Sequence, residues 1–199
     1  MKRSTLMNPS QLHNELKKVL VIDTETSGLD PLVHSVLSIG ITPLIGDLEE
    51  EYFVFESEII SDARSMAIHG IDLNWLSTHG QSPLSVCERF EHALSLLETD
   101  SILLAGHNIS FDISFMKRLY RVANRPWPQI ISHRSIDTHT MLWQLASAHL
   151  IPFEACSSDG AFKFFDCSPP DSLRHSALGD AIATKQLFLK LLEWTASRT

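Results

Sequence analysis

Two acidic residues placed one residue apart, Asp23 and Glu25, follow the apolar run 19–22 and carry the first chemical signal in the chain. Side chains in a β-strand alternate between its two faces, so these carboxylates should point to the same side as near neighbours. Like charges held this close raise each other's pKa unless a cation lies between them. The stretch therefore predicts one half of a metal site.

Three further residues stand where packing alone does not explain their type. Asp112 lies in the first turn of a predicted helix, although a carboxylate there also suits the helix dipole on its own account. His175 precedes Asp180 by five residues, which places His175 in a loop and Asp180 in the first turns of the next helix. The imidazole could remove a proton from water near neutral pH, whereas a lone loop histidine is usually exposed and idle.

Taken together, these residues resemble the motifs of the DEDDh family of 3′→5′ exonucleases, also called DnaQ-like or RNase H-like exonucleases. The motifs, in order, are Asp23-x-Glu25, Asn108-x-x-Phe111-Asp112 and His175-x-x-x-x-Asp180. The segment Ala67-Ile-His-Gly-Ile71 also looks like the proofreading subunit of bacterial DNA polymerase III. Ser176 and Ala177 stand where the tyrosine class of the family has its tyrosine, so this chain resembles the histidine class. The resemblance covers residues 19 to about 192.

The resemblance implies that four carboxylates hold two Mg²⁺ or Mn²⁺ ions and that a histidine acts as general base. The residues concerned are Asp23, Glu25, Asp112, Asp180 and His175. It implies release of nucleoside 5′-monophosphates from single-stranded 3′ ends, with DNA as the expected substrate and a DNA polymerase as a candidate partner. Two alternatives stay open: an RNA-trimming exoribonuclease of the same family, and a non-catalytic binding module associated with a polymerase. The complete set of ligands and base argues against the second.

The resemblance also implies a set of residues that grip the terminal nucleotide. They are Thr24, Thr26, Leu29, His69, Asn108 and Phe111. Thr26 and Leu29 are expected at the terminal base and sugar, and Asn108 is expected to provide a polar contact. For Leu29 and Phe111 the alternative is ordinary core packing, because apolar residues beside a strand end are mostly buried.

The elements that must position these residues follow from the apolar pattern. The predicted strands are residues 19–25, 35–44, 51–56 and 101–106, the first three as an antiparallel meander. The predicted helices are residues 63–70, 73–77, 83–99, 109–122, 135–150 and 177–197. Residues 152–171, rich in Ser, Asp, Pro and Gly, are expected to form a long loop. The resemblance adds a fifth strand, expected at 130–136. The predicted fold is α/β and RNase H-like, a five-stranded mixed sheet flanked by helices.

The composition limits the classes of protein that the chain can belong to. Its 199 residues, 44% of them hydrophobic, suffice for one core, and we expect a lead-in at 1–17, with a short helix at 9–18, before a single exonuclease domain at 18–199. No apolar run reaches the roughly 18 residues of a membrane span, and a secretory signal is lacking, so we expect a cytoplasmic protein without a membrane partner. The formal net charge of −8 favours short substrates over long nucleic acid gripped by charge.

The remaining acidic, basic and cysteine residues have simpler interpretations. The glutamates at 49–51 are expected in a solvated turn, and Asp137 is expected to cap or begin a helix. Scattered basic residues could line a path for phosphates: Arg64, Lys117, Arg118, Arg121, Arg125 and Arg134. The three cysteines form no metal-binding spacing and are expected to be reduced packing residues.

Overall fold

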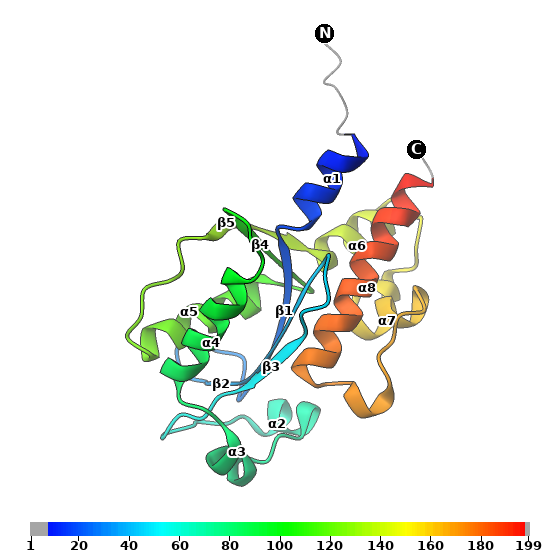
Figure 1. Ribbon diagram of the computed structural model, residues 1–199. Helices are drawn as coiled ribbons and strands as arrows, with labels where there is room; N and C mark the ends of the chain where they lie inside the picture. The colour runs from blue at the N-terminus through cyan, green and yellow to red at the C-terminus, as the bar shows by residue number, and fades with distance from the viewer. Residues whose placement is uncertain (1–7, 198–199) are drawn as a thin grey trace.

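A computed structural model of the protein describes residues 8–197 and has a five-stranded sheet at its centre, in the order β3-β2-β1-β4-β5 (Figure 1). The strands are β1 (Val19–Thr26), β2 (Val36–Pro43), β3 (Glu50–Phe53), β4 (Ile102–Gly106) and β5 (Ile131–Asp137). β1, β2 and β3 pair antiparallel, whereas β1, β4 and β5 pair in parallel. The predicted mixed sheet is confirmed, including the fifth strand near residues 130–136.

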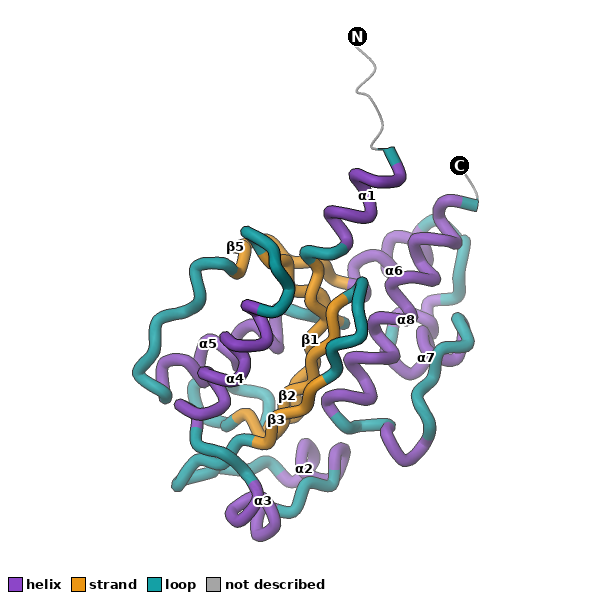
Figure 2. Tube along the Cα trace, in the orientation of Figure 1, coloured by secondary structure: helices purple, strands orange, loops and turns teal. Residues whose placement is uncertain are grey.

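Helices cover both faces of the sheet (Figures 1 and 2). One face carries α4 (Pro83–Ser95) and α5 (Ser110–Val122). The other carries α6 (Thr138–Ser147), α7 (Ser158–Phe164) and α8 (Ala177–Ala196). The remaining elements are α1 (Pro9–Leu16), α2 (Ala63–His69), α3 (Leu73–His79) and the 3₁₀ turns η1 (Phe153–Cys156) and η2 (Asp171–Leu173). Among residues 8–197, no helix is both long and apolar enough to cross a membrane.

The alternation of side chains along β1 decides which helices each residue meets. Leu20 and Ile22 belong to the core formed with α4 and α5. Val19 and Val21 pack instead with Ala181 of α8. The odd-numbered side of β1 therefore faces α8, and the two acidic residues that follow on that side face the same helix.

The prediction of a long loop at residues 152–171 is wrong, because this segment contains η1 and α7. Ala161 and Phe162 of α7 are buried against Leu142 of α6 and Leu187 of α8. α7 has only seven residues, and a helix of that length owes its stability to tertiary packing rather than to local pattern. The composition of the segment therefore indicated a loop where packing produces a helix.

The boundary between β5 and α6 differs by a few residues from the predicted one. A helix was expected at 135–150, but β5 continues through Asp137 and α6 begins at Thr138. The Asp137 side chain accepts a hydrogen bond from the backbone N–H of His139 at 3.0 Å, which confirms the predicted helix cap. The three cysteines are free and buried, as expected of packing residues.

Candidate active site

Three carboxylates meet between β1 and the start of α8. Asp23 and Glu25 face α8 from β1, and Asp180 lies in the first turn of that helix. One carboxylate oxygen of each residue lies within 4.8 Å of the other two. Since Mg²⁺ and Mn²⁺ bind oxygens at about 2.0–2.2 Å, a single cation could contact all three groups.

A glycine on β2 allows the start of α8 to approach the sheet this closely. Gly40 pairs with Asp23 in the register between β1 and β2. A Cβ atom at position 40 would lie 2.2 Å from the backbone of Ala177, the first residue of α8. A larger residue at Gly40 would therefore push the helix, and Asp180 with it, away from β1.

The electrostatics of the cluster fit a bound cation. Burial, followed by the charges of Asp112 and Glu25, raises the pKa of Asp23 well above its usual range. Burial, followed by the charge of Asp180, raises the pKa of Glu25 to about 8. Oδ1 of Asp180 is buried and has no hydrogen-bond partner among residues 8–197. Closely spaced carboxylates, one of which has a buried oxygen without a hydrogen-bond partner among the described residues, are typical ligands of a hard divalent cation such as Mg²⁺ or Mn²⁺.

Asp112 approaches β1 from the opposite side. It lies in the first turn of α5, is 4% exposed, and accepts a hydrogen bond of 2.8 Å from the hydroxyl of Thr24. Thr24 occupies the even-numbered side of β1, which explains why it meets α5 rather than α8. Burial raises the pKa of Asp112 to about 7. Asp112 is thus outside the cluster of three, although its charge acts on Asp23.

His175 lies on the loop before α8, at the edge of a pocket next to the cluster. Its backbone adopts a left-handed conformation, with φ of 62°. The pocket has a volume of about 440 Å³, and its lining includes Glu25, Glu51, His69, Trp75 and His175. A base at this position can exchange protons with water beside the carboxylates. Glu51, predicted in a solvated turn, lies instead on β3, where it accepts a hydrogen bond of 2.8 Å from the hydroxyl of Ser38.

Arg174 is a charged residue of the site to which the sequence assigned no role. Its guanidinium forms ion pairs with Asp180 and with Asp159 of α7. Its position directly before His175 is the one feature of the sequence that indicates a role in the site. The partner in α7 could not be found from the sequence because that segment was predicted to be a loop.

The residues predicted to grip a nucleotide lie around the end of β1 and the start of α5. The hydroxyl of Thr26 donates to the carbonyl of Gly28 at 2.7 Å, and Nε2 of His69 lies 3.3 Å from the carbonyl of Thr26. Leu29 is 75% exposed, so its alternative interpretation as a core residue is wrong. Phe111 is half-buried, packs against the core, and lies 4.8 Å from the ring of Phe115.

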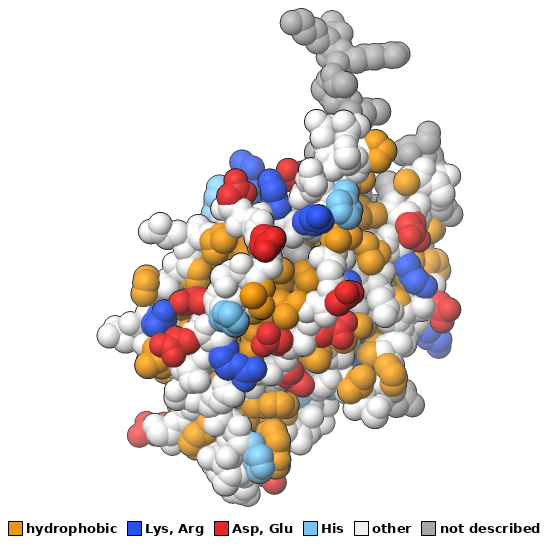
Figure 3. Space-filling view, viewed as in Figure 1, with side chains coloured by type: hydrophobic (Ala, Val, Ile, Leu, Met, Phe, Trp, Pro, Cys, Tyr) orange, Lys and Arg blue, Asp and Glu red, His pale blue; other side chains and the backbone are white. Residues whose placement is uncertain are grey.

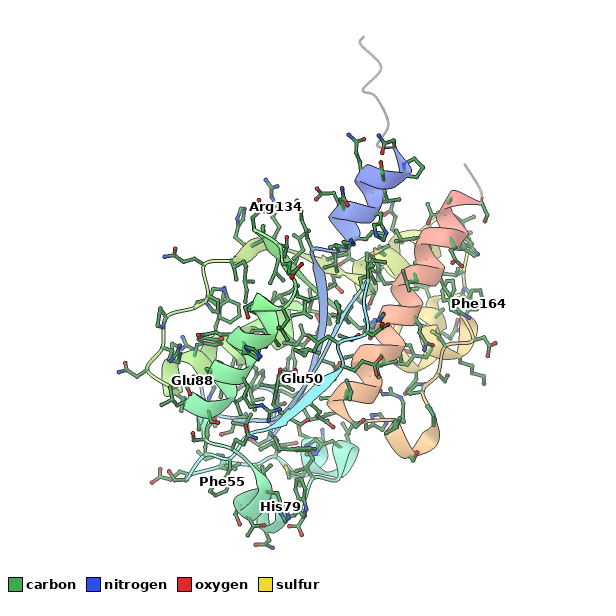
Figure 4. All side chains as sticks on the ribbon, in the orientation of Figure 1. Glu50, Phe55, His79, Glu88, Arg134 and Phe164 are labelled. Carbon is green, nitrogen blue, oxygen red and sulfur yellow. The ribbon has the colours of Figure 1, made fainter. Side chains whose placement is uncertain are left out.

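Asn108 and the basic residues complete the sequence-predicted set. Asn108 is exposed and has φ of 61°, and its backbone N–H donates to Asp137 at 2.8 Å. Arg118 is engaged with the buried Glu56. Arg134 lies on β5, at the edge of the sheet away from β3 (Figure 4). On the face shown in Figure 3, acidic and basic side chains are intermixed rather than gathered into a basic stripe.

Comparison with known proteins places this site in a family. A family model described as exonuclease, of the RNase T type, matches residues 20–188. A DNA polymerase III PolC-type protein of Thermotoga maritima is 31% identical over 178 residues, which are 87% of this chain and 12% of that protein. A ribonuclease T of Buchnera aphidicola is 27% identical over 206 residues, covering 92% of this chain and 90% of that protein. The chain spans less than a quarter of the length of the first polymerase-type relatives.

The fold is shared with solved nucleases. The nuclease domain of 3′hExo, described as a DEDDh family member bound to rAMP, superimposes with a TM-score of 0.69 at 13% identity. The alignment covers 88% of this chain and 91% of that one. The match to the family model covers the sheet except for the first residue of β1, and it extends into the first part of α8. The chain therefore belongs to the exonuclease family of the RNase T type, whose model it matches over residues 20–188.

Proposed function

We propose that this chain is a metal-dependent exonuclease that removes nucleoside 5′-monophosphates from single-stranded DNA in the 3′→5′ direction. The observation that carries the proposal is the cluster of Asp23, Glu25 and Asp180, with one oxygen of each within 4.8 Å of the others. The exonuclease domain would comprise residues 18–199, with residues 1–17 as a lead-in.

The four carboxylates would hold the cations, and the histidine would move the proton. Asp23, Glu25, Asp112 and Asp180 supply oxygen donors for two Mg²⁺ or Mn²⁺ ions. Such ions, when bound, neutralise charge on the phosphate and make water easier to deprotonate. His175 accepts a proton from the attacking water. The water oxygen joins the phosphorus, the P–O3′ bond breaks, and the shortened strand retains a 3′-hydroxyl.

The end of β1 would hold the terminal nucleotide against these carboxylates. Leu29 presents an exposed apolar side chain that a base can cover, and Phe111 offers an aromatic side chain from the start of α5. His69 fixes the backbone of Thr26 through its carbonyl. Thr24 contributes indirectly, because its hydroxyl orients Asp112. Asn108 would supply a polar contact to the strand.

The test is incubation with Mg²⁺ and single-stranded oligonucleotides labelled at either the 3′ or the 5′ end. We expect a ladder of products that keep the 5′ label, with mononucleotides released from the 3′ end. EDTA and the Asp23→Asn variant should abolish the reaction. Activity that survives both changes, or loss of nucleotides from the 5′ end, would overturn the proposal. A folded protein that binds oligonucleotides without cleaving them would favour the non-catalytic alternative.

Trimming of RNA is the second candidate, and one observation favours it. The chain covers 90% of a ribonuclease T, compared with 73% of a DNA polymerase III epsilon subunit and 12% of a PolC-type polymerase. Rates measured on DNA and RNA oligonucleotides of matched sequence would distinguish the two substrates. If RNA is cleaved faster, RNA becomes the proposed substrate in place of DNA, and a DNA polymerase is no longer the expected partner.

A further inference from the structure

Arg174 contacts a proposed metal ligand from outside the carboxylate cluster. One N–H of its guanidinium donates to Oδ2 of Asp180. Oδ1 of the same carboxylate is buried without a hydrogen-bond partner in the described part of the chain. The two oxygens of Asp180 therefore have separate surroundings: the arginine occupies one, and the other is left for a cation.

The guanidinium is fixed by α7 as well as by Asp180. It forms an ion pair with Asp159 and lies 3.4 Å from the hydroxyl of Ser158. Its carbon Cζ lies 5.4 Å from the ring centre of Phe162, and its side chain is only 17% exposed. A planar guanidinium held on several sides gives a carboxylate a defined orientation, which a single flexible charge would not.

We propose that Arg174 is a positioning residue that holds Asp180 through Oδ2 and so directs Oδ1 to the divalent cation. This inference rests on the proposed metal-dependent function. Arg174 also precedes His175 directly, so its anchoring to α7 fixes the loop that carries the proposed base. Groups that orient a metal ligand typically change metal affinity by about 10- to 100-fold when they are removed.

A competing possibility is that the arginine only neutralises the carboxylates and opposes the cation by its charge. The two roles predict opposite results. If Arg174 orients Asp180, removing it weakens Mg²⁺ binding. If it only opposes the cation, removing it leaves Mg²⁺ binding unchanged or makes it tighter.

The experiment measures Mg²⁺ binding to the full chain by isothermal titration calorimetry, without nucleic acid. Arg174→Met should raise the Kd for Mg²⁺ by about 10-fold or more. Arg174→Lys keeps the charge but replaces the planar fork that contacts Asp180 and α7 with a single ammonium group, and should weaken binding nearly as much. Arg89→Met is the matched control, since it removes an arginine of α4 that is paired with Glu50, outside the site, and should leave the Kd unchanged.

Circular dichroism in EDTA identifies the variants that remain folded, and the lysine variant decides the question if the methionine variant does not fold. A wild-type Kd in a folded Arg174→Met protein, or full recovery by Arg174→Lys, would overturn the orienting role. Absence of Mg²⁺ binding by the wild-type protein would instead refute the metal-dependent function itself. The two failures are therefore distinguishable.

Discussion

Replacing Glu25 by Gln should stabilise the metal-free protein while removing its activity. The carboxyl of Glu25 is held beside two other carboxylates, and burial raises its pKa from 4.5 to about 8. The unfolded chain releases that proton near pH 4.5, so the folded state binds more protons between the two values. The stability of the metal-free protein should therefore fall as pH rises from about 4.5 to about 8, and level off above that range.

The size of the effect follows from the pKa. At pH 7, which is about 2.5 pH units above the pKa of Glu25 in the unfolded chain, the raised pKa lowers the free energy of unfolding by about 1.4 kcal/mol for each of those pH units, or about 3 kcal/mol in all. Water in the adjacent open pocket screens part of it, which leaves about 1–2 kcal/mol. A neutral Gln of the same shape escapes this penalty. Since 1 kcal/mol shifts the Tm by about 2–4 °C in a protein of this size, the gain is measurable.

The assay is thermal unfolding of the wild type and Glu25→Gln in EDTA across pH 5 to 8.5, repeated with Mg²⁺. We expect the variant to gain Tm over the wild type as pH rises, and Mg²⁺ to stabilise the wild type more than the variant. Glu88→Gln, an exposed change on α4, is the control and should shift stability by less than about 0.5 kcal/mol. A variant with equal or lower Tm than the wild type at pH 8 in EDTA would refute the reasoning.

Two further predictions concern the packing of α8 and a histidine near the site. Gly40→Ala should lower the free energy of unfolding by about 1–3 kcal/mol and remove most of the activity, because the added methyl group collides with the backbone of Ala177. Urea unfolding measures the first effect and the nuclease assay the second. Wild-type values in both assays would contradict the close contact. Burial, followed by the charge of His139, lowers the pKa of His107 to about 4. The folded state then binds fewer protons than the unfolded state between about pH 6.5 and 4, so His107 should lower the stability of the protein as pH falls through that range. The free energy of unfolding of His107→Gln, measured with urea, should therefore fall by about 1–2 kcal/mol less than that of the wild type between pH 7.5 and 4.5. An equal fall in both proteins would contradict this prediction.

The carboxylates could be placed from sequence because they depend on short-range periodicity. Alternation along β1 alone puts Asp23 and Glu25 on one side, and the apolar residues before them show that the strand is buried. Asp180 follows from the start of a helix, which lies only three residues before it. What periodicity cannot supply is the distance between elements, which here depends on a glycine, Gly40, whose importance appears only when α8 is packed against it.

The contacts that the sequence did not reveal join segments that lie far apart in the chain or that have weak local signals. Arg174 meets Asp159 only because a seven-residue helix forms where composition indicates a loop. The bond from Thr24 to Asp112 spans 88 residues and depends on which helix covers each face of β1. A sequence motif identifies the functional residues, but it does not show which residues from other segments contact them.

The docking of α8 against Gly40 has a consequence for the order in which the protein becomes active during its synthesis. The carboxylate cluster joins positions 23 and 25 to position 180, so every element from β2 to η2 is synthesised before the last ligand can reach the first two. A nascent chain that lacks α8 carries the strands and the first carboxylates, but not the complete cluster. We expect such a chain to lack nuclease activity, which should begin only when α8 has docked.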